Sequence, residues 1–186
     1  LTASPGVHSS IRECPMSFKP RLRLPRRQPM LHLQCSDVEF SVWCPQPDLV
    51  PTVAEFGDAV ALALEVTALP VHREALVLLD ERRRITAILL DPPAEVGVWV
   101  GRCAGPGLET PFSNTICIIV RDHVKGGPPS SEDRSSYQAL RRIHMAQGLL
   151  LLDALLTDGD RVQSLAIGCD PDPVWFDEFA PLDPAA

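Results

Sequence analysis

Hydrophobic and polar residues follow two different periods in the first third of the chain. Apolar and polar side chains alternate across residues 31–44, which is typical of a β-strand, and Pro45 ends the pattern. Across residues 48–65, apolar side chains recur at steps of three and four positions. This second period predicts a helix, with Thr52 in place to cap its first turn. The pattern therefore predicts one strand followed by one helix.

Short apolar runs dominate the middle of the chain. The runs 74–80 and 85–90 flank a charged turn, and this arrangement is typical of an antiparallel hairpin. The β-branched run 115–120 is typical of a buried central strand. Residues 91–114 show no clear period, so we expect a long connection with a short element near residues 96–100.

The last part of the chain predicts another helix and a second pair of strands. After the polar loop 121–129, apolar residues on one face predict a helix that Gly148 ends. The run 149–156, an Asp-Gly-Asp turn and the run 162–167 then predict two paired strands. Helical segments that alternate with strands are typical of the α/β class. We therefore expect an α/β fold.

Composition separates a basic leader from an acidic body. The chain has 186 residues, of which 45% are hydrophobic, enough to build one compact domain. Six of the 17 Lys and Arg residues but only one of the 24 Asp and Glu residues lie in the segment 1–30, while the whole chain carries a net charge of −7. The acidic body argues against a protein that covers nucleic acid or an anionic membrane with its whole surface.

Other features of the sequence concern the leader, the cellular location and the cysteines. Five prolines and no apolar period predict that residues 1–30 are extended or disordered, either as a basic docking arm or as a product of the wrong translation start. The chain lacks an apolar stretch of about 18 residues and a signal peptide, which predicts a cytoplasmic protein without a membrane partner. Its six cysteines form no Cys-x-x-Cys pair and favour buried thiols over a disulfide or zinc framework.

Several segments after residue 70 resemble one known family, the JAB/MPN metalloprotease-like domain, and most closely the JAB-type domain of the bacterial RadC family. The resemblance spans about residues 70–168 and implies a cytidine-deaminase-like mixed sheet flanked by helices. The segments that carry it are 73–80, 118–123, 127–133 and 151–165. The JAB/MPN-like domain is therefore expected at 70–168. Composition and hydrophobic pattern place three segments around it: the leader 1–30, a strand and helix at 31–69 packed on or extending the core, and a Pro- and aromatic-rich tail at 169–186.

The resemblance implies a hydrolytic site. In that family a Glu acts as general base, a His-x-His pair and a downstream Asp bind zinc, and a Ser lies three residues before that Asp. Zinc-bound water then attacks an amide or isopeptide carbonyl, because three protein ligands leave one open position and a carboxylate removes the proton. At the matching positions this sequence has Glu74, Ser130 and Asp133.

The His-x-His pair is incomplete in this sequence. Family spacing counted back from Ser130 places the two ligands at Val120 and Asp122, whereas a one-residue deletion places them at Arg121 and His123. Valine offers no lone pair, and a guanidinium cannot ligate a cation and repels it. Either register leaves at most one imidazole, so we expect a weak zinc site or none.

The residues that remain also have structural interpretations. Ser130 and Asp133 can form a cap at the start of a helix, where an acid is favoured by the helix dipole. Glu74 can be a solvated or paired carboxylate at the start of a strand. His123 can pair with Asp122, Glu74 or Asp133, or face solvent.

We therefore expect a non-catalytic JAB-like domain that binds a protein partner and needs no cofactor. In this hypothesis Arg121 fills the metal position and neutralises Glu74 and Asp133. The alternative is a zinc-dependent JAMM-type peptidase or isopeptidase that uses Asp122 or His123 with Asp133, and Glu74 as base. A third hypothesis, a RadC-like role in DNA repair, depends on nucleic-acid binding by the basic leader.

Overall fold

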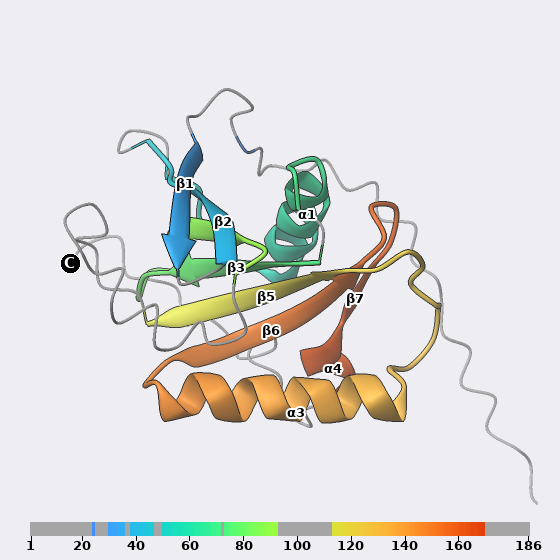
Figure 1. The fold of residues 1–186 in the computed structure, drawn as a ribbon. Coiled ribbons are helices and arrows are strands. Elements are labelled where there is room, and N and C mark those ends of the chain that lie inside the picture. Colours follow the sequence, from blue (N-terminus) through green and yellow to red (C-terminus); the bar gives the residue numbers. More distant parts are fainter. Residues whose placement is uncertain are drawn as a thin grey trace, which may run out of the picture.

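In the part of the chain that the structure describes, seven strands form a central mixed β-sheet (Figure 1). The computed structural model describes residues 24, 30–35, 38–46, 50–71, 73–92 and 113–169. The strands are β1 (Met30–Cys35), β2 (Val38–Trp43), β3 (Glu74–Leu79), β4 (Ile85–Leu90), β5 (Asn114–Val120), β6 (Leu150–Thr157) and β7 (Val162–Ser164). The helices are α1 (Phe56–Thr67), α3 (Ser131–Ala146) and α4 (Leu165–Cys169).

The strands lie in the order β1-β2-β4-β3-β5-β6-β7. Within the described part of the chain, β5 and β6 are the one parallel pair, and every other neighbouring pair is antiparallel. Parallel strands cannot be joined by a tight turn, and α3 supplies the crossover between β5 and β6. The polar loop after β5 therefore leads directly to the start of α3.

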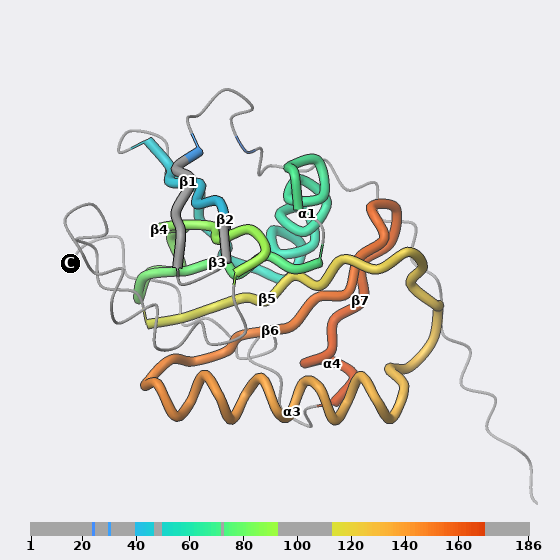
Figure 2. The backbone as a smooth tube through the Cα atoms, in the orientation of Figure 1, coloured from blue at the N-terminus to red at the C-terminus, as the bar shows by residue number. Residues whose placement is uncertain are grey.

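Helices cover both faces of the sheet, as Figures 1 and 2 show with α1 on one side and α3 on the other. Strand alternation sends Val77, Ile118 and Leu155 into the core cluster that includes α1. It sends Cys117 and Leu156 to the opposite side, into a cluster that includes Tyr137 of α3. The predicted α/β class, with helices flanking a mixed sheet, is confirmed.

The hairpin of β3 and β4, the buried strand β5 and the helix α3 are confirmed as well. Gly148 ends α3 as predicted, with a φ of 72° that favours glycine. Its backbone N–H donates to the carbonyl of Met145, and the N–H of Leu149 donates to that of His144, each at 3.0 Å. These two bonds satisfy the last carbonyls of the helix.

The single strand predicted for residues 31–44 is wrong, because two antiparallel strands occupy this segment. Cys35 of β1 pairs with Val38 of β2, so the chain reverses after Cys35. Only two residues separate the strands, and they are Ser and Asp, which favour turns. The apolar positions change from odd to even numbers at this reversal, a shift in the alternation that the single-strand prediction overlooked.

The predicted start of the first helix is also wrong. The helix α1 begins at Phe56, and Thr52 instead forms an isolated bridge with Arg84 beside the hairpin. The side chain of Asp58 accepts hydrogen bonds from the backbone N–H groups of Ala54 and Glu55, at 3.0 and 3.3 Å. An acid inside the first turn therefore caps this helix in place of the threonine.

The last predicted strand is shorter than expected. The strand β7 ends at Ser164, and residues 165–167 belong to α4 rather than to the strand. The hydroxyl of Ser164 accepts the N–H of Ile167 at 3.0 Å, and Asp153 of β6 accepts the N–H of Ala166 at 3.0 Å. These acceptors satisfy two helical N–H groups and stop the strand.

One residue of the basic leader is part of the hydrophobic core. Leu24 is 4% exposed and packs in the cluster that includes α1, so at this residue the expectation of an unpacked leader is wrong. The rest of the leader before Met30, the element expected near residues 96–100 and the tail after Cys169 lie outside the described residues. Among the described helices, none is both long and apolar enough to cross a membrane.

Candidate functional site

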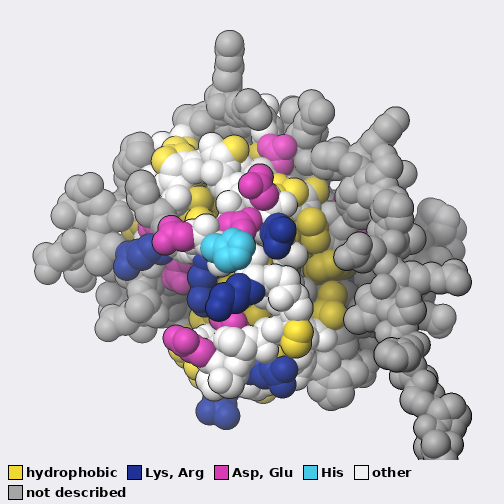
Figure 3. Space-filling view, turned by 90° about the vertical axis from the view of Figure 1, so that its right-hand side faces the viewer, with side chains coloured by type: hydrophobic (Ala, Val, Ile, Leu, Met, Phe, Trp, Pro, Cys, Tyr) yellow, Lys and Arg dark blue, Asp and Glu magenta, His cyan; other side chains and the backbone are white. Residues whose placement is uncertain are grey.

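The residues that the sequence singled out meet at one end of the sheet. Glu74 is the first residue of β3 and pairs with Ile119 near the end of β5. The segment 121–123 directly follows β5, and Ser130 and Asp133 lie at the start of α3. Figure 3 views this end of the molecule, where acidic, basic and histidine side chains gather on one face.

Asp133 is held by Arg121 and Ser130. The guanidinium nitrogen Nη2 of Arg121 lies 3.1 Å from Oδ1 of Asp133. The hydroxyl and the backbone N–H of Ser130 donate to Oδ2 of Asp133, at 2.6 and 3.2 Å. Both oxygens of this carboxylate therefore accept hydrogen bonds from the chain itself.

The contacts between Ser130 and Asp133 form a capping box. The N–H of Asp133 donates back to the hydroxyl of Ser130 at 3.1 Å, which confirms the capping interpretation. The hydroxyl bond from Ser130 is the main cause that holds the pKa of Asp133 below its ordinary value, and Arg121 adds to the effect. Asp133 is thus ionised at neutral pH and paired with a fixed cation.

Arg121 faces the α3 side of the sheet. Its backbone N–H donates to the carbonyl of Thr157 at 2.9 Å, so pairing with β6 continues one residue past β5. Ile119 packs in the cluster beneath α3, and alternation places Arg121 on that same face. Val120 lies between them in sequence and therefore points to the opposite face.

His123 has a partner that the sequence analysis did not consider. Its Nδ1 lies 3.8 Å from Oδ2 of Asp158, while 67% of the side chain is exposed. Of the alternatives expected for His123, the solvent-facing one agrees with this exposure, since its ion-pair distance is to Asp158 rather than to Asp122, Glu74 or Asp133. Asp122 itself is exposed.

Asp158 also fixes the loop after β5 and the turn that it begins. It accepts the N–H of Val124 at 2.9 Å, and those of Asp160 and Arg161 at 3.1 and 2.8 Å. These bonds lower its pKa, the bond from Val124 most of all.

Glu74 has different charged neighbours from Asp133. Burial is the main cause that raises the pKa of Glu74; Arg73 opposes this shift and Asp91 adds to it. The expectation that Arg121 neutralises both carboxylates therefore matches Asp133, whereas the cation that acts on Glu74 is Arg73.

Asp91 is a further residue that the sequence analysis missed. Its carboxylate accepts the N–H groups of Arg73 and Glu74, at 2.7 and 3.2 Å, and its own N–H donates to the carbonyl of Glu74 at 2.7 Å. Its φ of 49° lies in the left-handed region, which Asp adopts more readily than most residues. Asp91 thus joins the end of β4 to the start of β3.

The donor set at this end of the sheet does not fit a zinc ion. Among the described residues, no three His, Cys, Asp or Glu side chains are grouped to hold one metal. The carboxylate of Asp133 is already paired with a guanidinium, and a second cation beside Arg121 would be repelled. His123 lies beside Asp158 instead.

Comparison of the chain with protein-family models, with curated proteins and with solved structures finds no match. The case for a function therefore depends on the residues of the chain and their contacts. Those contacts describe a charged end of an α/β sheet in which an arginine neutralises the acid at the start of a helix.

Proposed function

We propose that residues 70–168 form a JAB/MPN-like domain of the RadC type that has lost its metal site and acts as a non-catalytic protein-interaction or scaffolding module. The order of elements supports this proposal: a hairpin, a buried strand, a polar loop, a helix opened by Ser-x-x-Asp, and a final strand pair. The observation that carries it is the ion pair between Arg121 and Asp133.

The direction of Arg121 supports one of the two ligand registers. Arg121 is on the face that carries Ile119 and α3, while Val120 is on the other face. This favours the register in which Arg121 and His123 stand at the two imidazole positions. A guanidinium at the first position supplies a positive charge to Asp133 but no lone pair for a metal.

The ion pair accounts for a loop that keeps its shape without zinc. The guanidinium of Arg121 anchors the residue after β5 to the first turn of α3. A positive charge there offsets the negative charge of Asp133, as a metal ion would, without the dehydration that metal binding requires.

The alternatives have less support. A JAMM-type hydrolase needs Asp133 on one ion with Asp122 or His123, but Asp133 pairs with Arg121 and His123 lies beside Asp158. The DNA-repair hypothesis depends on the leader, where Leu24 is the one residue described before Met30. No observation favours either alternative.

A double-mutant cycle tests whether the Arg121–Asp133 pair stabilises the domain. Thermal unfolding is measured for Arg121→Ala, Asp133→Ala and the double variant of the full chain. The pair is partly exposed, so we expect a coupling of about 0.2–1 kcal/mol and a lower melting temperature for Arg121→Ala. Arg142→Ala, an exposed arginine on α3, is the matched control and should leave stability unchanged. Zero coupling, or equal effects of the two arginine variants, would refute the role of Arg121.

A further inference from the structure

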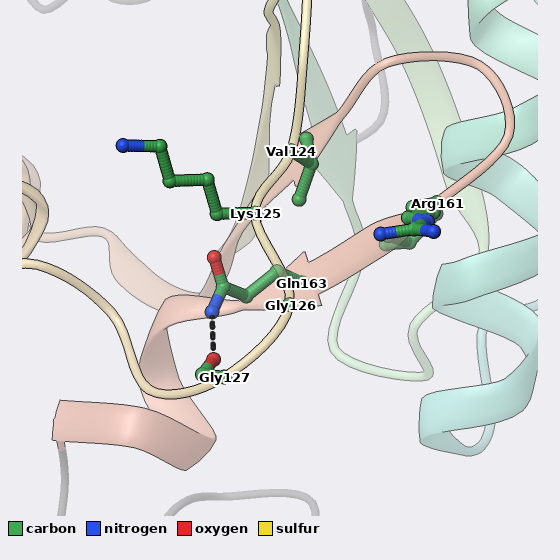
Figure 4. A pocket seen from close by; sticks show the side chains of 7 residues that line it. Val124, Lys125, Gly126, Gly127, Arg161 and Gln163 are labelled. Carbon is green, nitrogen blue, oxygen red and sulfur yellow. Dashed lines mark hydrogen bonds between the residues drawn. The ribbon is translucent and has the colours of Figure 1, made fainter.

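A groove lies between the loop after β5 and the edge strand β7 (Figure 4). Its volume is about 400 Å³. The lining residues are Val124, Lys125, Gly126, Gly127, Arg161, Val162 and Gln163. None of them belongs to the Arg121–Asp133 pair, so the groove is a separate feature of the same end of the molecule.

The loop that forms one wall of the groove is fixed by two hydrogen bonds. The side-chain Nε2 of Gln163 donates to the carbonyl of Gly127 at 2.6 Å, which Figure 4 shows as a dashed line. The N–H of Val124 donates to Asp158 at 2.9 Å, and the side chain of Val124 is buried. The groove is therefore formed before any ligand binds, which lowers the entropic cost of binding.

Among the described residues that line the groove, two are cations and none is acidic. Lys125 and Arg161 are exposed, and within the described part of the chain neither side chain forms an ion pair or a hydrogen bond. The neighbouring acid, Asp158, accepts backbone N–H groups and lies beside His123. The groove thus offers two positive charges that no described residue pairs.

The arrangement of the groove fits an extended chain better than a compact anion. Lys125 and Arg161 lie at opposite ends of the view in Figure 4, with Val124 and Gln163 between them. A side chain added at Gly126 or Gly127 would meet nothing within 4 Å, so the space above this backbone is open. The strand β7 is also the last strand of the described sheet, and a peptide can lie along such an edge.

We propose that this groove binds an extended acidic segment of a partner protein, with carboxylates of the segment at Lys125 and Arg161. The partly exposed apolar side chain of Val162 would contact the uncharged residues between those carboxylates. This inference rests on the interaction role proposed above, and it names the surface and the chemistry of the partner.

Fluorescence anisotropy with a short labelled peptide, in which Asp and Val alternate, tests the proposal on the full chain. We expect saturable binding that weakens with added salt. Lys125→Glu combined with Arg161→Glu should weaken it by about tenfold or more, because charges that face the ligand are reversed. Arg82→Glu combined with Arg142→Glu is the matched control: both arginines are exposed elsewhere, and the net charge changes by the same amount. The control should bind like the wild type.

Three results would overturn the proposal. The first is that the wild-type protein does not bind the peptide, which means that the groove does not take this ligand. Equal weakening in the two double variants indicates attraction by overall charge. The third is that inorganic phosphate displaces the peptide at concentrations at which chloride of equal ionic strength leaves it bound. That result indicates a site for a small anion. None of these results bears on whether Asp133 binds zinc, so a failure of the groove and a failure of the non-catalytic assignment are distinguishable.

Discussion

The two acids of the candidate site, Glu74 and Asp133, have opposite electrostatic surroundings. The hydroxyl of Ser130 lowers the pKa of Asp133, so its ionised form stabilises the folded state above its ordinary pKa, and this stability is lost as pH falls through the lowered value. Burial raises the pKa of Glu74, so its ionised form costs stability at neutral pH, and the cost disappears as pH falls through the raised value.

Replacement of Glu74 by Gln should therefore raise stability at neutral pH. We expect a gain of no more than about 1 kcal/mol, because the carboxyl is only partly buried and solvent screens its charge. The gain should vanish below a pH of about 4, where the wild-type carboxyl is protonated in both the folded and the unfolded states. Urea unfolding at several pH values measures the difference. Glu81→Gln, at the exposed hairpin turn, is the control. A loss of stability at neutral pH would show that the charge of Glu74 has a favourable partner.

At the scale of elements, the short helix α4 depends on a buried acid in a neighbouring strand. Asp153 of β6 is 0% exposed and accepts the hydroxyl of Ser164 at 2.6 Å and the N–H of Ala166 at 3.0 Å. A helix of five residues is not stable alone, so these bonds hold it against the sheet. A side chain added at Gly168 of α4 would overlap the ring of Pro129, so the helix and the loop before α3 are in close contact.

Asp153→Ala should consequently destabilise the protein by about 1–3 kcal/mol, because a buried hydroxyl and a helical N–H lose their acceptor. Asp160→Ala, in the exposed turn between β6 and β7, should change stability much less. Chemical denaturation of the two variants gives the comparison directly. Equal stabilities would mean that α4 is held by its apolar contacts alone.

The sequence predicted elements whose signals are local. The hairpin, β5, α3 and its end at Gly148 all follow from apolar runs, charged turns and caps within a few residues. The start of α1 was misplaced although its cap is local, because Asp58 accepts the N–H groups of Ala54 and Glu55 and the prediction used Thr52 instead. The helix α4 was missed because a contact with a distant strand fixes it, through Asp153. No pattern in a single sequence encodes which distant strand supplies such a contact.

The same distinction holds for the candidate site. The bond between Ser130 and Asp133 was predicted, because a capping box joins residues three positions apart. The pairing of Arg121 with Asp133 followed from the family resemblance. The contact between His123 and Asp158 was not predicted, because it forms only when β6 lies beside β5.

At the scale of the whole molecule, the antiparallel pairing of β3 with β5 and the crossover through α3 bring four segments to one end of the sheet. They are the start of β3, the loop after β5, the start of α3 and the turn between β6 and β7. This end carries both the Arg121–Asp133 pair and the groove beside β7. The proposed interaction role assigns partner binding to this end, where the Arg121–Asp133 pair joins the loop after β5 to α3.

The zinc content of the full chain tests this account most directly. The protein is purified without chelator, incubated with zinc, freed of unbound metal and measured by elemental analysis, alongside Asp133→Ala. We predict far less than one zinc per chain, with the same amount in the variant, because Arg121 already occupies the carboxylate of Asp133. One zinc per chain that disappears in Asp133→Ala would contradict the account.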